Sequence, residues 1–162
     1  MQTLKELLLR EPRWTLAVAE SLTCGQLQAS IGAISGASEF FAGGITAYSL
    51  EQKVRHLGVD RDLAASVNSV SAEVAEQMAR GACDLFGTTL GVSTTGYAEP
   101  SPDHGVLHPF AWWGICHQHG NTSIVRTGRV ECAGLPRVEV QRRVAETVLV
   151  QLLAYLKTAR SV

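Results

Sequence analysis

The sequence has little net charge and no long apolar run, and these absences exclude several classes of protein. Its 162 residues carry 14 Lys and Arg against 15 Asp and Glu, a formal net charge of −1. No one-signed basic field is therefore present to attract nucleic acid or an anionic membrane, and we expect neither partner. No apolar run reaches the ~18 residues of a membrane-spanning helix. Residues 1–7 carry charges within their apolar stretch, unlike a signal peptide, so the expected location is the cytoplasm.

Cysteine is scarce and unclustered. The four cysteines lie far apart in the sequence, and no two of them form a C-x-x-C motif: Cys24, Cys83, Cys116 and Cys132. That spacing argues against a zinc clip and a disulfide framework, so we expect buried, reduced thiols. His117 and His119 share one face of an expected strand, but no carboxylate or cysteine completes a ligand set at suitable spacing. No metal site is expected.

Helical and strand patterns alternate along the chain. Apolar residues at helical spacing, with caps and breakers, predict helices over 3–10, 23–34, 51–57, 71–87 and 137–157. Short apolar or alternating runs predict strands over 14–19, 43–49, 89–95, 110–117 and 122–130. This alternation favours an α/β fold, a three-layer α/β/α sandwich with a mixed sheet, as one domain over residues 1–162.

A turn rich in hydroxyls follows the first predicted strand. Ser21 and Thr23 precede a helix whose free amides could hold a phosphate or carboxylate, and Gly25 would allow close backbone approach. Thr95 and Gly96 end the third predicted strand and could supply donors to the same ligand, because ligands of open α/β sheets gather at strand ends. The alternatives are a plain helix cap at the first turn and an ordinary turn at the second.

Candidates for a nucleophile and its base lie a little further along the chain. A lysine can activate a serine when burial or nearby positive charge lowers its pKa from ~10.4 toward neutrality. Lys53 is the only lysine between Lys5 and Lys157. Ser38 lies in a loop whose backbone amides could form an oxyanion hole. The alternatives are a solvated helix lysine and a capping serine.

An ordered set of motifs gives the chain a family resemblance. The set reads Ala19-Glu20-Ser21-x-Thr23-x-Gly25, Gly36-x-Ser38-x-x-Phe41-x-x-Gly44-x-x-x-Tyr48-Ser49-x-x-x-Lys53-x-x-x-Leu57-Gly58-Val59, Val70-Ser71, Met78-Ala79-x-Gly81 and Thr95-Gly96-x-Ala98-x-Pro100. In order and separation these motifs resemble the CinA C-terminal domain family over nearly the whole chain. The resemblance implies an amidohydrolase without a cofactor, similar to the nicotinamide mononucleotide deamidases, which release ammonia and nicotinic acid mononucleotide.

The resemblance also implies catalytic roles. Carried over by position, Ser38 would attack the carboxamide carbon, and Lys53 would take the proton of its hydroxyl. Tyr48 and Ser21 would orient this pair or pass protons. Protonated Lys53 could then supply the proton that departing ammonia requires.

A nucleotide substrate is implied in the same way, with Thr23, Gly25, Thr95 and Gly96 holding it. Arg142 in the last predicted helix is expected to bind its phosphate, because the forked donors of arginine suit that group. Its neighbour Arg143 and a solvated arginine are the alternatives. Family members are commonly oligomeric, so a homo-oligomer is expected.

Departures from the family pattern leave a second hypothesis open. Cys24 replaces the first glycine of a Gly-Gly pair, Glu99 enters an Ala-Gly-Pro turn, and Trp112 and Trp113 lie in a strand that usually reads Pro-Val-Gly-Thr-Val. Added charge and bulk beside the site would restrict the space for an anionic substrate. The alternative function is therefore a catalytically silent or substrate-shifted member that binds nucleotides or proteins.

Overall fold

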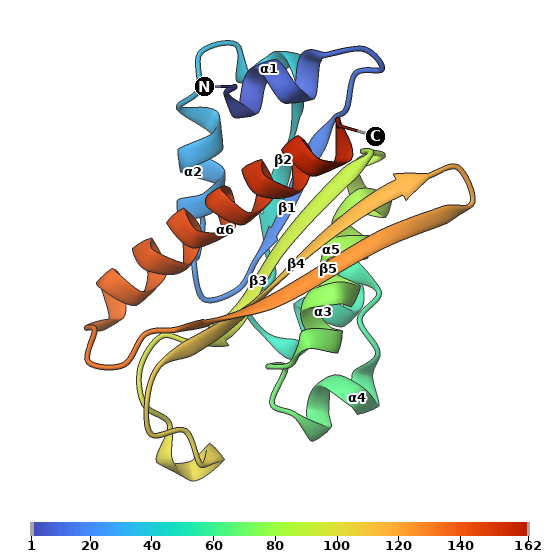
Figure 1. The fold of residues 1–162 in the computed structure, drawn as a ribbon. Coiled ribbons are helices and arrows are strands. Elements are labelled where there is room, and N and C mark those ends of the chain that lie inside the picture. Colours follow the sequence, from blue (N-terminus) through green and yellow to red (C-terminus); the bar gives the residue numbers. More distant parts are fainter. Residues whose placement is uncertain (1, 162) are drawn as a thin grey trace.

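Helices and strands alternate through residues 2–161, the part of the chain that the computed structural model describes (Figure 1). The helices are α1 (Leu4–Leu9), α2 (Gln26–Gly32), α3 (Leu50–Leu57), α4 (Arg61–Ser66), α5 (Ala72–Phe86) and α6 (Arg137–Ala159). The strands are β1 (Leu16–Glu20), β2 (Phe41–Thr46), β3 (Leu90–Tyr97), β4 (Phe110–His119) and β5 (Thr122–Glu131). Short 3₁₀ turns, η1 (Ala37–Glu39) and η2 (Pro102–His104), precede β2 and β4.

The strands form one five-stranded mixed sheet in the order β2-β1-β3-β4-β5. Strand β1 is parallel to β2 and β3, whereas β4 is antiparallel to β3 and β5. The predicted α/β fold with a mixed sheet is confirmed. Because β1, β2 and β3 run the same way, their carboxyl ends lie at one edge of the sheet.

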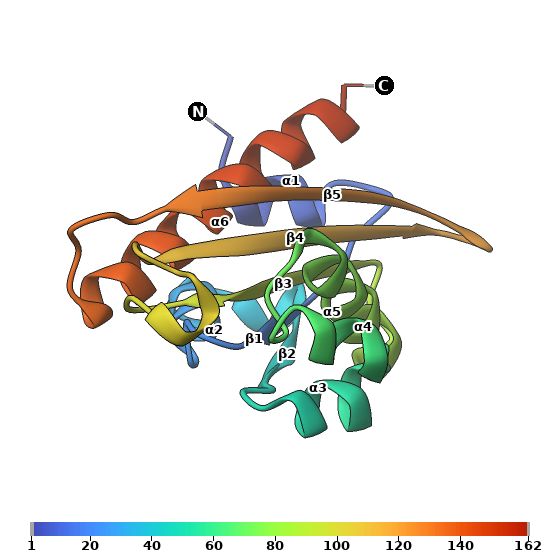
Figure 2. The same cartoon turned by 90° about the horizontal axis from the view of Figure 1, so that it is seen from below.

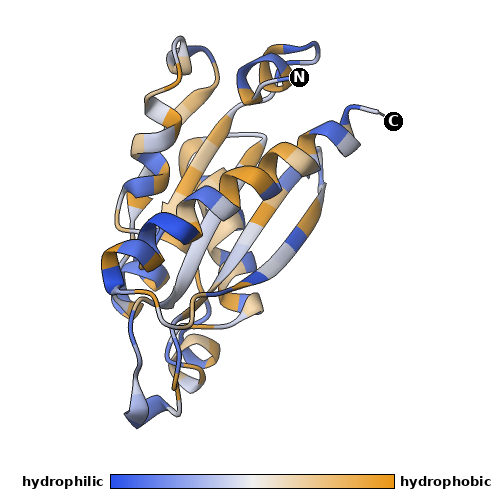
Figure 3. Cartoon of the chain, turned by 60° about the vertical axis from the view of Figure 1, so that its left-hand side comes forward, coloured by the Kyte–Doolittle hydropathy of each residue, from blue (hydrophilic) through white to orange (hydrophobic). Residues whose placement is uncertain are grey.

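Helices cover both faces of this sheet (Figure 2). Helices α1, α2 and α6 pack on one face, where Leu7, Ile31 and Val148 are buried against the strands. Helices α3, α4 and α5 pack on the other, where Leu57 and Met78 are buried. Apolar residues concentrate in the strands and in the carboxyl-terminal half of α6 (Figure 3). No helix within residues 2–161 is long and apolar enough to cross a bilayer.

The turn between β1 and α2 differs from the sequence prediction. Helix α2 begins at Gln26, later than predicted, because Cys24 and Gly25 adopt left-handed conformations with φ of 50° and 99°. The Cys24 side chain is consequently exposed, which corrects the expectation of a buried thiol. The remaining thiols, Cys83, Cys116 and Cys132, are buried as predicted.

Candidate functional site

A cavity of about 390 Å³ opens at the carboxyl ends of β1 and β3. The chain leaves β1 for β2 on one side and later returns to β3 on the other, so this is the point where the strand order reverses, the usual ligand site of open α/β sheets. The lining residues come from the ends of strands and the segments that follow them: Ser21, Leu22, Tyr48, Ser49, Leu50, Lys53, Asn68, Ser69, Val70, Thr95, Gly96, Tyr97 and Ala98.

A buried lysine and a serine meet in this cavity. Lys53 Nζ lies 2.9 Å from Ser21 Oγ and 2.8 Å from the backbone oxygen of Tyr48. The Lys53 side chain is 1% exposed, and Ser21 is 7% exposed. Burial lowers the pKa of Lys53 from 10.5 to about 8, since an ammonium removed from water loses its hydration. At this pKa about a tenth of Lys53 is the neutral amine at pH 7, and that form can accept a proton.

Local structure holds both groups in place. Ser49 Oγ accepts from the Gln52 amide and caps α3, whose buried face carries Lys53 and, one turn later, Leu57. Ser21 follows β1 directly, and its backbone amide donates to the carbonyl oxygen of Thr94 at 3.0 Å. The hydrogen bond between Lys53 and Ser21 therefore connects the helix that follows β2 to the ends of β1 and β3.

The amides at the start of α2 are not available to a ligand. The carboxylate of Glu20, which is fully buried, accepts from the backbone N–H groups of Gly25, Leu27 and Gln28 at 2.8–3.1 Å. This internal carboxylate occupies the place that the sequence analysis reserved for a substrate anion. Gly25 serves the left-handed turn, and it does not line the cavity.

The other hydroxyl residues predicted to bind substrate divide into two groups. Thr23 is buried and does not line the cavity, and its hydroxyl lies 2.7 Å from the Thr94 hydroxyl. Thr95 lines the cavity, but its hydroxyl donates to the Ser69 carbonyl at 2.6 Å. Gly96 also lines the cavity, and a side chain there would collide with the Phe110 carbonyl oxygen. Thr95 and Gly96 therefore form part of the wall, and the hydroxyls of Thr23 and Thr95 are already engaged in hydrogen bonds within the protein.

The predicted pairing of Ser38 with Lys53 is wrong. Ser38 lies in η1, before β2, and its side chain is exposed, whereas Lys53 follows the same strand. The six residues of β2 span about 20 Å at ~3.3 Å per residue, which places the two side chains at opposite edges of the sheet. Ser21 occupies the position beside Lys53 that the sequence analysis gave to Ser38.

The predicted phosphate partner Arg142 also lies outside the cavity. It is exposed on α6 and paired with Glu139, and its neighbour Arg143 is exposed as well. The arginine beside the site is Arg137, the first residue of α6. It donates to the Tyr48 hydroxyl at 2.7 Å, which places its guanidinium at the rim.

Several lining residues had no signal in the sequence. Asn68 and Ser69 both adopt left-handed conformations, with φ of 49° and 61°, although neither is glycine. Asn68 donates to the Tyr97 hydroxyl at 3.0 Å. Consecutive strained residues of this kind cluster at functional sites, but only an observed conformation reveals them.

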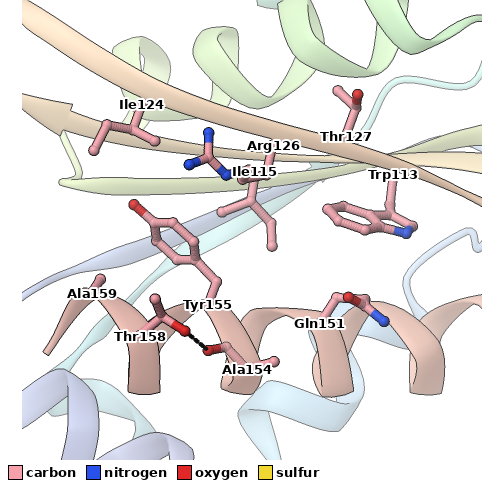
Figure 4. A pocket seen from close by; sticks show the side chains of 10 residues that line it. All are labelled: Trp113, Ile115, Ile124, Arg126, Thr127, Gln151, Ala154, Tyr155, Thr158 and Ala159. Carbon is pink, nitrogen blue, oxygen red and sulfur yellow. Dashed lines mark hydrogen bonds between the residues drawn. The ribbon is translucent and has the colours of Figure 1, made fainter. Parts of the chain in front are cut away.

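Neither tryptophan that departs from the family pattern lines this cavity. Trp113 lines a different hollow of about 460 Å³ between the β4–β5 hairpin and α6, where Tyr155 points toward the strands (Figure 4). Arg126 is the charged member of that lining. A buried nucleophile with a neighbouring base is missing among these residues, so the smaller cavity is the candidate site.

The histidines of β4 form an aromatic cluster. The rings of His117 and His119 lie 3.9 Å apart between centroids, and His117 Nδ1 lies 2.8 Å from the Tyr155 hydroxyl. Burial lowers the pKa of His117 to about 4. Across residues 2–161, His, Cys, Asp and Glu side chains form no group of three that could hold a metal ion.

Comparison of the sequence with known proteins gives one family. The CinA C-terminal domain profile matches residues 1–156. A CinA-like protein of Chlorobium limicola is 38% identical over 152 residues, which are 93% of this chain and 35% of that protein. A CinA-like protein of Myxococcus xanthus is 48% identical over 92 residues, 57% of this chain and 22% of that protein. The chain thus spans about a third or less of these relatives.

Solved structures with the same fold cover most of the chain. The crystal structure of a competence-damaged protein (CinA) superfamily protein from Enterobacter cloacae superposes with a TM-score of 0.84 at 25% identity, covering 94% of this chain and 88% of that one. The competence damage-inducible protein A from Klebsiella pneumoniae gives a TM-score of 0.81 at 26% identity, covering 89% and 87% of the two chains.

Proposed function

The chain belongs to the CinA C-terminal domain family, and on that premise we propose that it is an amidohydrolase in which Ser21 is the nucleophile and Lys53 the general base. Nicotinamide mononucleotide is the proposed substrate, because the family includes deamidases of that nucleotide. The proposal rests on the 2.9 Å distance between the buried Lys53 amine and the Ser21 hydroxyl, both of which line the cavity.

The chemistry of the pair supports this assignment. A neutral amine has a lone pair and two N–H groups. One N–H can donate to the Tyr48 carbonyl, and the lone pair can then accept the Ser21 proton. Both hydrogen bonds of Lys53 go to uncharged oxygens, so no carboxylate stabilises the ammonium form at this distance.

The proposed reaction has two halves. As Lys53 takes the Ser21 proton, Oγ adds to the carboxamide carbon, and the amide oxygen becomes an oxyanion. Protonated Lys53 then delivers its proton to the nitrogen, the C–N bond breaks, and ammonia leaves an acyl ester on Ser21. Water, deprotonated by Lys53, hydrolyses this ester to the carboxylic acid and restores the serine hydroxyl.

The backbone of the turn offers a donor for the oxyanion. Leu22 follows Ser21 and lines the cavity. Among the hydrogen bonds within residues 2–161, its amide N–H has no acceptor, whereas the Ser21 amide is engaged by Thr94. A preorganised N–H beside the nucleophile is the arrangement that stabilises tetrahedral intermediates of acyl transfer.

The direct experiment incubates the purified protein with nicotinamide mononucleotide and measures ammonia together with nicotinic acid mononucleotide. We expect equal amounts of both products. A trapped acyl ester at Ser21, identified by mass spectrometry after acid quench, would support the covalent route.

Absence of turnover at high protein concentration, with nucleotide binding retained, would contradict the proposed activity. That outcome would favour the alternative of a catalytically silent member that binds nucleotides. Normal turnover by a Ser21→Ala variant would instead preserve the activity and overturn the assigned nucleophile.

A further inference from the structure

Arg137 lies at the rim of the cavity, where a ligand can replace the groups that its guanidinium contacts. Arg137 Nη2 lies 2.7 Å from the Tyr48 hydroxyl, and Nη1 lies 3.2 Å from Glu99 Oε2. Tyr48 is half exposed and lines the cavity that holds Lys53. The Arg137 guanidinium therefore stands at the mouth of the cavity whose interior contains the proposed dyad.

The position of Arg137 is not explained by helix stability. Arg137 is the first residue of α6, where a positive side chain opposes the helix dipole. The preceding residue, Pro136, makes no side-chain capping bond that would offset this. What holds the guanidinium is its pair of contacts across the rim, with Tyr48 and Glu99.

The contact with Glu99 is a weak one by its geometry. A guanidinium and a carboxylate bind best through two parallel N–H···O bonds, but here one N–H reaches one oxygen at 3.2 Å. The side chains of Arg137 and Glu99 are 44% and 56% exposed, so water competes for both. Exposed pairs of this kind contribute little to stability. A dianionic phosphate with fork-shaped complementarity can displace this carboxylate.

We propose that Arg137 recognises the anionic group of the substrate and that Glu99 is a specificity-determining residue that competes with that anion for the guanidinium. The inference rests on the proposed amidase function, since it concerns the substrate of the same cavity. Glu99 weakens the binding of carboxamides that carry a phosphate group and has little effect on the binding of carboxamides that lack one. The residue thus lowers the preference of this site for nucleotides over nucleosides.

The test compares two ligands that differ by one phosphate, nicotinamide mononucleotide and nicotinamide riboside. Their dissociation constants are measured by calorimetry in a Ser21→Ala background, so that hydrolysis does not interfere. Glu99→Gln should tighten the nucleotide about fivefold relative to the riboside, the scale of an exposed ion pair. Arg137→Gln should weaken the nucleotide about tenfold or more, the scale of a lost charge-assisted hydrogen bond.

A matched control is Glu131→Gln, which removes the same charge from another exposed pair, that with Arg129 on β5. It should leave the ratio of the two dissociation constants unchanged. In the double variant Glu99→Gln with Arg137→Gln, the gain from the first change should vanish, because the guanidinium for which Glu99 competes is absent.

Two outcomes would overturn the inference: an unchanged nucleotide-to-riboside ratio in Glu99→Gln, or no binding of nucleotide or inorganic phosphate at millimolar concentrations. Ammonia release by the parent protein is measured separately. If no ammonia is released but the binding ratios change as expected, the amidase function is refuted and the roles of Arg137 and Glu99 stand. If ammonia is released but the ratios do not change, the amidase function stands and the roles of Arg137 and Glu99 are refuted.

Discussion

Both edges of the parallel strands carry a serine and a lysine, and the two neighbourhoods differ in burial and charge. At the amino edge, Ser38 is exposed, and Lys5 lies 3.1 Å from the Glu39 carboxylate. At the carboxyl edge, Ser21 and Lys53 are buried together, and the hydrogen bonds of the amine go to a hydroxyl and a carbonyl. Residue types alone therefore do not make a Ser/Lys dyad. In the proposed function, exclusion of water and of counter-ions is what distinguishes the reactive edge from the other.

The largest expected difference between the edges is at the two serines. Ser21→Ala should reduce deamidation about 10⁴-fold or more, the scale of removing a covalent nucleophile. Ser38→Ala, the matched change at the exposed edge, should stay within about twofold of the parent. Steady-state ammonia release, with circular dichroism to verify folding, measures both. Loss of turnover in Ser38→Ala with normal turnover in Ser21→Ala would reverse the comparison.

Next in size is the difference between the two lysines. Lys53→Met keeps the apolar stem and removes the base, so we expect turnover to fall about 10³-fold, within the usual range for general base catalysis. Lys5→Met removes a charge from the solvated edge and should alter turnover less than twofold, as for an ordinary surface site. An active Lys53→Met protein would show that another group deprotonates Ser21.

Helix α2 connects the two edges and should depend on one carboxylate. Glu20→Ala leaves buried amide donors at the start of α2 without an acceptor, so the free energy of unfolding should fall by at least about 3 kcal/mol. Glu39→Ala, which breaks the exposed pair with Lys5, should cost about 0.5 kcal/mol. Urea unfolding monitored by circular dichroism tests both, and equal losses would remove this distinction.

The buried lysine should also make stability depend on pH. Its folded pKa of about 8 lies below the unfolded value of 10.5, so the unfolded state binds more protons between these values. Stability should therefore rise with pH through this window by about 2 kcal/mol between pH 7 and pH 9.5, with the full penalty present below pH 8. The kcat/KM value should instead rise as the pH approaches 8 and level off above it, because the neutral amine forms over that lower range.

Lys53→Met is the reference for this pH effect, since it should remove the lysine contribution to the slope of unfolding free energy against pH. Chemical denaturation at several pH values gives that slope. Identical slopes in the parent and Lys53→Met would mean that Lys53 keeps an ordinary pKa in the folded protein.

The smallest expected effect concerns the turn that leads from β1 into α2. Cys24 has a φ of 50°, which glycine adopts at less cost than any residue with a Cβ atom. Cys24→Gly should stabilise the protein by about 1 kcal/mol. Cys24→Ala removes the thiol and keeps the Cβ strain, so it should give no such gain. Thermal unfolding of the two variants side by side separates conformation from thiol chemistry.

Much of the fold follows from local patterns. The alternating runs placed every strand of the sheet to within a few residues, and the apolar spacing of Val140, Val144 and Val148 identified the buried face of α6. The spacing of apolar residues and the presence of helix-capping residues are local properties, so they can be recognised in a single sequence. The start of α2 was misplaced because left-handed backbone at Cys24 has no sequence signature as strong as that of glycine.

The site was predictable in part. Lys53 was singled out because lysine is rare in this chain, and the resemblance implied that Ser21 orients the catalytic pair or passes protons. The pairing with Ser38 was implied by the family resemblance, and the order of motifs along a chain does not show which edge of a parallel strand a loop occupies. The sequence did not predict Arg137 or Asn68 at the site, since their positions depend on how α6 and the segment after α4 approach β3 and Tyr48.

By itself, the sequence determined the chemical inventory and the order of elements: hydroxyls after β1, one lysine after β2, and helices that alternate with strands. The tertiary structure decided which of these groups meet. Parallel pairing of β1 with β2 and β3 brings Ser21 and Lys53 to one edge and leaves Ser38 at the other. Burial at that edge then lowers the pKa of Lys53, a property of the folded protein that no residue carries alone.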